Sequence, residues 1–413
     1  MSASSTCDAL PEDVLTVEQA QDLILNGITA ITATELVDLK QANGRILAED
    51  IQAGFDVPPY CNSSMDGYAF AYQSLLTHAK LTQIGISWAG RPYLGTVQLG
   101  ECVRIMTGAC LPAGTDTVEM QENTEKLDEH IIMHGSPKLG ENVRYPGDDL
   151  KQGEIILTIG RKLTAADIGM LASLGMVQVK VLRKLRIAFL STGDELKSTG
   201  APLAWGEIYD SNRYTLHALL QHLPVDILDL GIIPDQAEAV EQAFLQAKTK
   251  ADLLITSGGV SVGDADFVTK TLSKLGQVKF WKMAMKPGKP LAYGRLDDCL
   301  FFGLPGNPVS VIVTFLLFVR PAILKLAGNT VTQAITHTAT TLTPLKKTPG
   351  RKDFQRGIYQ RTTEGYQVKT TGEQASHVLR SMSQANCFIV LEREWGDIEV
   401  GSQVKILPFD SLV

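Results

Sequence analysis

The chain has 413 residues, of which 44% are hydrophobic and 20% are charged, and its formal net charge at pH 7 is −7. At roughly 100–200 residues per domain, this length predicts two to four domains, each able to bury a hydrophobic core. The acidic balance argues against a surface that coats nucleic acid or an anionic membrane.

The first part of the chain is predicted to be helical. Residues 1–11 lack a basic segment followed by an apolar run, so no secretory signal is expected. Apolar side chains recur at helical spacing over residues 16–26, with Thr16 at the start of the helix. A second helix is predicted over residues 33–41, followed by an extended stretch over residues 45–51.

An inserted β-rich domain is predicted next. Pro58 and Pro59 would break a helix, and glycine and proline then recur between short β-type runs as far as about residue 144. A helix is expected again over residues 165–173. The segments on the two sides of the β-rich part are therefore expected to form one domain with an insertion. The β-type runs are residues 81–88, 102–106 and 117–121.

From residue 185 to about residue 328, strands and helices alternate, which predicts a parallel sheet flanked by helices. The apolar run over residues 309–319 is shorter than the roughly 20 residues that span a bilayer, so we expect a buried core helix. After residue 329 the pattern becomes β-type again and predicts a small β domain. The expected strands are residues 186–190, 226–230, 253–256, 277–283, 290–293, 300–302, 335–342, 367–371, 388–391 and 404–406, and the expected helices are residues 212–222, 237–247 and 266–275.

Three polar loops are predicted at strand ends, over residues 191–195, 257–266 and 303–308. Ligands of an open parallel α/β sheet bind beyond the carboxyl ends of its strands. Glycine after a strand is also ordinary turn chemistry, but three loops at one edge favour a ligand site. Gly258, Gly259 and Gly263 would let the backbone approach a ligand closely, and helix N-termini would offer N–H groups to an anion.

The sequence lacks both a P-loop and a G-x-G-x-x-G motif, which argues against a simple kinase or an NAD enzyme. Acidic residues nevertheless gather at the same edge, and carboxylates are of the type that holds Mg²⁺ beside water and phosphate oxygens. They are Asp194, Glu195, Asp235, Asp264 and Asp266. Helix caps and solvated loop acids are the alternative, above all for Asp235.

Lysines lie beside prolines and a glycine in the segment that follows. The basic residues are Lys282, Lys286 and Lys289, and two prolines and a glycine stiffen the loop over residues 286–290. Ammonium groups fixed in this way would bind an oxyanion at a lower entropic cost. A solvated lysine loop is the alternative. The six cysteines form no C-x-x-C pair, so neither a zinc site nor a disulfide framework is predicted, and we expect reduced thiols in a cytoplasmic protein.

Several different short motifs follow one another along the chain, within a pattern that extends from about Thr16 to the C-terminus. They are NSSMDGYA over residues 62–69, IMTG over 105–108, STGDEL over 191–196, SGGVS over 257–261 and GLPGNP over 303–308. Taken alone, the first two would be predicted as turns. Together the motifs resemble the signature segments of the molybdopterin molybdenumtransferase family, also called MoeA, which includes the E domain of gephyrin.

The resemblance implies an N-terminal domain formed by residues 1–50 and 149–183 and split by a β-rich domain over residues 51–148. It also implies an α/β domain of the molybdopterin-adenylyltransferase type over residues 184–328 and a C-terminal β-barrel over residues 329–413. A cytoplasmic homodimer that shares its active sites between copies is expected. Molybdopterin adenylyltransferase and molybdoenzyme delivery proteins are the other expected partners, with no nucleic acid and no membrane.

The family's activity is the insertion of molybdate into adenylated molybdopterin, with Mg²⁺-dependent release of AMP. The resemblance selects Glu195, Asp235 and Asp266 from the acids named above as the metal ligands and makes Asp66 a candidate proton donor for oxo groups that leave as water. The catalytic positions that it implies are Asp66, Thr107, Asp149, Glu195, Asp235 and Asp266. The positions expected to bind substrate or molybdate are Arg144, Ser257, Gly258, Gly259, Lys282, Lys286, Pro305, Pro308, Arg356 and Ser376.

Three positions depart from the family pattern, because Asp, Pro and Val are expected where Cys61, Cys110 and Glu119 stand. They lie beside motif residues and not on them. Three other functions stay open at this point: an adenylyltransferase that uses ATP, a non-catalytic scaffold like gephyrin, and a plain nucleotide or oxyanion binder. The additional N-terminal and C-terminal domains argue against the first, and the acidic and lysine loops together argue against the second.

Overall fold

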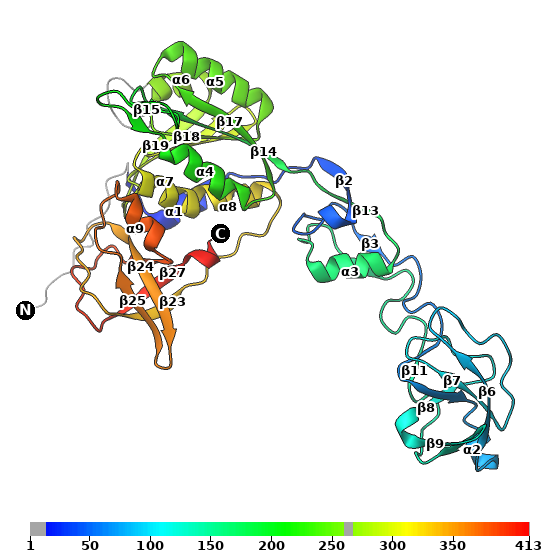
Figure 1. The fold of residues 1–413 in the computed structure, drawn as a ribbon. Coiled ribbons are helices and arrows are strands. Elements are labelled where there is room, and N and C mark those ends of the chain that lie inside the picture. Colours follow the sequence, from blue (N-terminus) through cyan, green and yellow to red (C-terminus); the bar gives the residue numbers. More distant parts are fainter. Residues whose placement is uncertain (1–13, 260–266, 413) are drawn as a thin grey trace, which may run out of the picture. The chain divides into compact units, whose positions relative to one another are not determined.

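The computed structural model describes residues 14–259 and 267–412 (Figure 1). The chain divides into two compact units, one made of Met1–Thr34 and Leu182–Val413 and the other of Glu35–Val181. The second unit is thus inserted into the sequence of the first.

The larger unit is built on a mixed sheet. Its described strands have the order β1 (Val14–Leu15), β19 (Gln277–Met283), β21 (Pro290–Leu296), β22 (Cys299–Leu304), β18 (Leu253–Ser257), β14 (Leu185–Thr192) and β17 (Val225–Ile233). β14 pairs in parallel with β17 and β18, and β18 pairs in parallel with β22, as the alternating pattern predicts. β21 is antiparallel to both of its neighbours, because connections of six residues (284–289) and two residues (297–298) are too short for the crossover that a parallel pair needs.

Helices cover both faces of this sheet and give it two hydrophobic cores. One core contains α1 (Val17–Asn26), α4 (Ser211–Gln221) and the helical segment Pro308–Leu326. The other contains α5 (Ala237–Lys250) and α6 (Phe267–Leu275). α1 begins where it was predicted to begin, with Thr16 and Gln19 forming a reciprocal capping box.

The segment Pro308–Leu326 consists of α7 (Pro308–Thr314), a π-helical turn (Phe315–Val319) and α8 (Arg320–Leu326). Among the described residues it is the one helix long and apolar enough to cross a membrane. However, 78% of its apolar window is buried inside the protein, which confirms the predicted core helix.

A closed β-barrel forms the C-terminal part of the larger unit. Its described strands are neighbours in the order β24 (Lys352–Thr362), β25 (Gly365–Thr370), β23 (His337–Thr341), β27 (Gln403–Pro408) and β26 (Cys387–Leu391). Pairing of β24 with β26 closes the ring. β24 was not predicted, because its buried stretch contains Asp353, Gln355 and Arg356 and so lacks an apolar alternation.

The fully described unit Glu35–Val181 contains a six-stranded sheet of order β8-β5-β7-β6-β10-β9. Three of these strands, β6 (Leu81–Ser87), β7 (Glu101–Ile105) and β8 (Thr117–Met120), are the predicted β-type runs. Three further ladders of two strands each bring together segments distant in sequence, and α3 (Ala165–Ser173) is the predicted helix. The other strands of the six-stranded sheet are β5 (Gly67–Phe70), β9 (Thr124–Leu127) and β10 (His130–Met133), and two of the ladders are β4 (Asn62–Ser63) with β11 (Val143–Arg144) and β3 (Ile51–Gln52) with β12 (Ile155–Leu157).

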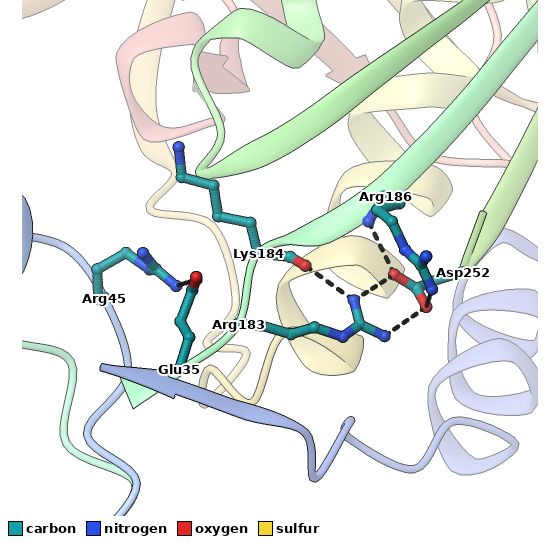
Figure 2. A network of polar contacts seen from close by, with 6 residues as sticks. All are labelled: Glu35, Arg45, Arg183, Lys184, Arg186 and Asp252. Carbon is teal, nitrogen blue, oxygen red and sulfur yellow. Dashed lines mark hydrogen bonds and ion pairs between the residues drawn. The ribbon is translucent and has the colours of Figure 1, made fainter. Parts of the chain in front are cut away.

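The prediction of a helix over residues 33–41 was wrong. The segment forms β2 (Thr34–Asp38) and a short 3₁₀ turn, Leu39–Gln41, and β2 pairs with β13 (Gln178–Leu182). A strand partner far along the chain supplies the backbone hydrogen bonds here, and the local sequence pattern cannot reveal it. Within this unit Glu35 also forms an ion pair with Arg45 (Figure 2).

Candidate active site

A cleft of about 890 Å³ lies in the larger unit and includes residues at the carboxyl ends of β14 and β18 and just after β22. These are the three strand ends at which polar loops were predicted. Among the predicted site residues, those that line the cleft are Glu195, Asp235, Ser257, Gly258, Gly259, Lys286, Pro305, Pro308 and Ser376.

Gly258 and Gly259 meet the end of β14 so closely that side chains would not fit. Both have positive φ angles, of 91° and 67°. A Cβ atom at Gly258 would lie 2.8 Å from the carbonyl oxygen of Thr192, and one at Gly259 would lie 3.0 Å from the Thr192 hydroxyl. Glycine is therefore required at this edge by both conformation and space.

The carboxylate of Glu195 lies against the backbone of Gly193 at the mouth of the first loop. A Cβ atom at Gly193 would lie 2.6 Å from Oε2 of Glu195, and Gly193 has a φ of 147°. The glycine thus leaves the space that the carboxylate occupies. Glu195 itself is solvent-exposed and lines the cleft, where it can meet a cation or a phosphate-bearing ligand.

The start of α4 contributes two polar side chains, Asp210 and Asn212, that were not among the predicted site residues. Asp210 is 2% exposed and caps α4 by accepting a hydrogen bond from the backbone N–H of Arg213 at 3.1 Å. Asn212 donates from its side-chain amide to the hydroxyl of Ser257 at 2.8 Å and to the carbonyl oxygen of Gly306 at 2.7 Å. The signal that could have found them is a cap-type aspartate directly before a predicted helix.

Buried polar atoms without partners gather near this edge. In the part of the chain that the structure describes, five such atoms belong to residues at the ends of β14 and β18 or at the start of α4. Buried polar atoms are nearly always hydrogen-bonded, so a group of exceptions indicates a place for water or a ligand. The atoms are the hydroxyl oxygens of Ser191, Thr192 and Thr256, Oδ2 of Asp210 and Oδ1 of Asn212.

The lysine loop lies at another side of the cleft. Lys286 is exposed, lines the cleft and is in register with Asp353 where β20 (Met285–Lys286) pairs with β24. Asp353 is buried, and burial raises its pKa, although the charge of Lys286 acts in the opposite direction. Lys282 is exposed on β19 beside Val14 of β1 and does not belong to the described lining of the cleft.

The barrel contributes a loop to the same cleft, and a buried arginine holds this loop. Arg356 is 1% exposed, and burial lowers its pKa. Its backbone N–H donates to the side chain of Gln374 at 2.7 Å, and its guanidinium donates to the carbonyl oxygen of Ala375 and to the hydroxyl of Ser381, both at 3.2 Å. The carbonyl oxygen of Ser376 accepts from the N–H of Val309 in α7 at 3.1 Å.

Three barrel residues that line the cleft were missed in the sequence analysis. They carry polar or ionisable side chains, but no local motif marks them, because they reach the cleft through the barrel's tertiary packing. Pro305 and Pro308, by contrast, lie where they were predicted, and Pro308 is the first residue of α7. The missed residues are Arg351, Gln374 and His377.

Two acids of the cleft, Glu195 and Asp235, fit a magnesium site, whereas Asp266 lies outside the described residues. The described residues contain no group of three His, Cys, Asp or Glu side chains that could hold a metal ion. Mg²⁺ at phosphate sites commonly uses one or two carboxylates and completes its shell with water and substrate oxygens. The donor set present at the cleft therefore suits Mg²⁺ bound together with a phosphate-bearing substrate.

In the Glu35–Val181 unit, two predicted residues meet directly. Asp66 accepts from the backbone N–H of Thr107 at 2.7 Å and from its hydroxyl at 2.8 Å. These bonds, with the charge of Arg104, hold the pKa of Asp66 below its ordinary value of 3.8. The carboxylate is thus ionised at neutral pH and fixes the Thr107 turn.

Arg144 and Asp149 lie elsewhere in the same unit, and both are solvent-exposed. Arg144 is in register with Asn62 in the β4–β11 ladder, so it belongs to the surface that carries the first predicted motif. The backbone N–H of Asp149 donates to the carbonyl oxygen of Val57 at 2.9 Å, which ties down the segment that closes the insertion.

Comparison with known proteins gives matches along nearly the whole chain. Family models described as "MoeA N-terminal region (domain I and II)", "Probable molybdopterin binding domain" and "MoeA C-terminal region (domain IV)" match residues 15–175, 188–325 and 338–409. A molybdopterin molybdenumtransferase of Haemophilus influenzae is 46% identical over 403 residues, covering 97% of this chain and 100% of that protein. The chain belongs to the molybdopterin molybdenumtransferase family. It is therefore an enzyme of molybdenum cofactor biosynthesis.

More distant members of the MoeA family agree with this assignment. Gephyrin of Dictyostelium discoideum is 35% identical, over 95% of this chain and 62% of that protein. The crystal structure of a molybdopterin biosynthesis MoeA protein from Pyrococcus horikoshii has a TM-score of 0.80 and 27% identity, covering 96% of this chain and 100% of that one. The family resemblance and the fold class inferred from the sequence motifs are confirmed.

The three departures from the MoeA pattern all lie in the Glu35–Val181 unit. Cys110 pairs with Asn62 in an isolated bridge, and burial and the nearby Cys61 raise the pKa of its thiol. Glu119 is buried and accepts hydrogen bonds from the N–H of Met120 at 3.0 Å and from the side chain of Asn123 at 2.9 Å. Glu119 therefore organises the chain immediately after β8.

Proposed function

We propose that the chain inserts molybdate into adenylated molybdopterin and releases AMP with the assistance of Mg²⁺. The observation that carries this proposal is the composition of the cleft. Its lining combines the acids Glu195 and Asp235 with cations such as Lys286 and Arg351 and with the glycine-containing loops at the strand ends. A substrate with a pyrophosphate bridge and a separate tetrahedral oxyanion needs both kinds of group.

At the phosphate end, the backbone of the glycine loop and the first turns of α4 and α7 would face the pyrophosphate. N–H groups at helix N-termini suit phosphate oxygens. Glu195 and Asp235, together with Asp266, would hold Mg²⁺ against the phosphates. Bound there, the ion would polarise the phosphoanhydride and stabilise the departing AMP.

At the molybdate end, Lys286 would hold the dianion by charge-assisted hydrogen bonds, with Lys282 and Ser376 as further donors. Because Arg356 is 1% exposed, its side chain is not open to a ligand in the cleft, and we therefore assign it a positioning role. Its hydrogen bonds to Gln374 and Ala375 fix the loop that carries Ser376 to the cleft.

Molybdate loses oxo groups as water when the dithiolene sulfurs bind the metal, and this step consumes protons. Asp66 was the sequence-based candidate for a donor. The lowered pKa of Asp66 and its two hydrogen bonds from Thr107 favour an anchoring role over donation. We therefore propose that Asp66 holds the Thr107 turn in the shape that the reaction requires.

We also propose that the enzyme is a cytoplasmic homodimer whose active sites draw residues from both copies. Family membership supports this proposal. Mixing inactive Asp66→Asn protein with inactive Glu195→Gln protein tests it, because subunit exchange would create some sites free of both substitutions. Recovery of activity on mixing is the expected result, and no recovery despite exchange would argue for sites within one copy.

The proposed reaction is tested by measuring AMP release from adenylated molybdopterin, with Mg²⁺ and with or without molybdate. Release that depends on molybdate, with molybdenum retained on the pterin, is the expected result. Binding without release would contradict the transferase activity. Consumption of ATP with unadenylated molybdopterin would instead favour the adenylyltransferase alternative. Glu195→Gln is the matched inactive variant, because it removes the charge and keeps the shape.

A further inference from the structure

An apolar and an aromatic side chain also line the cleft, in addition to its polar loops. Ile208 and Tyr209 form β16 (Ile208–Tyr209), and both line the cleft. They remain 54% and 44% exposed, so both present apolar surface that a ligand could cover. The two residues directly precede the buried Asp210, so the aromatic surface continues into the polar group at the start of α4.

The ring of Tyr209 is held in place although it is exposed. Its hydroxyl donates a hydrogen bond to the carbonyl oxygen of Ala201 at 2.8 Å. Its backbone is paired with Lys197 of β15 (Leu196–Lys197), and the Lys197 carbonyl accepts from the next N–H, that of Asp210, at 3.0 Å. An ion pair of 3.0 Å between Lys197 and Glu207 stabilises the loop that connects these two parallel strands.

A side chain fixed in this way offers an aromatic face at little entropic cost. Tyrosine presents a large rigid ring with only two side-chain torsions. The Tyr209 hydroxyl already donates a hydrogen bond within the protein, so the orientation of the ring is fixed before a ligand binds. A purely structural role would bury the ring, but Tyr209 lines the cleft and is 44% exposed. The arrangement suits a flat ligand that stacks on the ring.

We propose that Tyr209 is the stacking subsite for a flat heteroaromatic ring of the substrate. This inference rests on the proposed function, because adenylated molybdopterin has two such rings, adenine and the pterin. Both offer a π face that can stack on an aromatic side chain. Tyr209 is a specificity-determining residue for the ring, while the neighbouring loops contact the phosphates.

The test is calorimetric titration of the full-length protein and its variants with AMP and, separately, with 6-hydroxymethylpterin. Tyr209→Leu keeps an apolar side chain without a π face and should weaken binding of at least one probe about tenfold. Tyr209→Phe keeps the ring and should stay within about threefold of the wild type. Melting temperatures identify any variant that fails to fold.

Tyr214→Leu is the matched control, because Tyr214 is similarly exposed on α4 but does not belong to the described lining of the cleft. A loss for AMP alone assigns adenine to Tyr209, and a loss for the pterin alone assigns the pterin. Unchanged affinity for both probes in Tyr209→Leu overturns the proposal, as does wild-type protein that binds neither. Failure of the proposed function is seen separately, as absence of molybdate-dependent AMP release.

Discussion

The side-chain amide of Asn212 donates a hydrogen bond to the hydroxyl of Ser257 at 2.8 Å. The same nitrogen also donates to the carbonyl oxygen of Gly306 at 2.7 Å. One side chain at the start of α4 thus joins the end of β18 to the loop before α7. These are two of the three loops predicted to form the ligand site, so their relative position depends on a residue outside both.

Replacing Asn212 by Ala should loosen these loops more than it destabilises the fold. Loss of the two hydrogen bonds should cost roughly 1–3 kcal/mol of unfolding free energy. Misplacement of the cleft loops should lower kcat/KM for AMP release by more than tenfold. The control is Asn386→Ala, because Asn386 similarly bonds the backbone of Tyr359, at 2.8 and 3.0 Å, in the barrel. Equal loss of activity in both variants would contradict a special role for Asn212.

Gly193→Ala should displace the carboxylate of Glu195. The added methyl would lie 2.6 Å from Oε2, closer than two nonbonded atoms can approach, so Glu195 must move. We expect activity to fall at least tenfold and the Mg²⁺ concentration needed for half-maximal activity to rise. Both quantities come from AMP-release assays over a magnesium series.

Gly200→Ala is the control for backbone strain in this experiment. Gly200 also has a positive φ, of 88°, but a Cβ atom there would meet nothing within 4 Å. The Gly200→Ala variant should therefore carry the backbone strain of an alanine at positive φ but keep near-normal activity. Loss of activity in Gly200→Ala as large as in Gly193→Ala would mean that strain, and not the carboxylate, explains the effect.

The parts of the fold that the sequence predicts well are those with a clear apolar pattern. The helix α1 buries apolar side chains at helical spacing, and the strands β14, β18 and β22 are short, nearly continuous apolar runs that are buried along most of their length. The three strand-end loops then follow from sheet topology alone. The sequence pattern therefore predicts that Glu195 and Ser257 lie at one cleft, although it contains no information on tertiary contacts.

The parts that the sequence does not predict depend on buried polar residues and distant partners. Arg356 would be expected to bind molybdate from a surface, but it is buried and bonds Gln374, Ala375 and Ser381. β2 forms a strand because it pairs with β13, more than 140 residues away. Such contacts follow from tertiary packing, which a periodic pattern does not encode.

Lys286→Ala should weaken the dependence on molybdate more than the binding of nucleotide. Hydrogen bonds to charged groups contribute roughly 1.5–3 kcal/mol, so the molybdate concentration for half-maximal activity should rise about 10- to 100-fold. The affinity for AMP, measured by titration, should change less than about threefold. Lys369→Ala, at an exposed barrel position outside the described lining of the cleft, is the control. Equal losses for molybdate and AMP would mean that Lys286 serves the phosphates or the fold.

Asp252 should make the stability of the larger unit depend on pH. Arg183 donates to both of its carboxylate oxygens at 2.7 Å, and the N–H of Arg186 donates at 2.7 Å (Figure 2). Burial raises the pKa of Asp252, but these hydrogen bonds and the two arginine charges outweigh it and hold the pKa below 3.8. Because folding lowers this pKa, the stabilisation is present above the unfolded value of about 4 and is lost as the pH falls through the folded value.

Asp252→Asn removes the charge and keeps the shape of the side chain. At pH 7 we expect it to lower the free energy of unfolding by roughly 1.5–3 kcal/mol, the range for hydrogen bonds to charged groups. The difference from the wild type should persist at pH 5 and shrink below about pH 4, as measured by urea denaturation. Asp22→Asn, at an exposed position on α1, should change stability by less than about 0.5 kcal/mol. A difference for Asp252→Asn that stays constant down to pH 3 would show that the amide disturbs packing and that the arginine pairing contributes little.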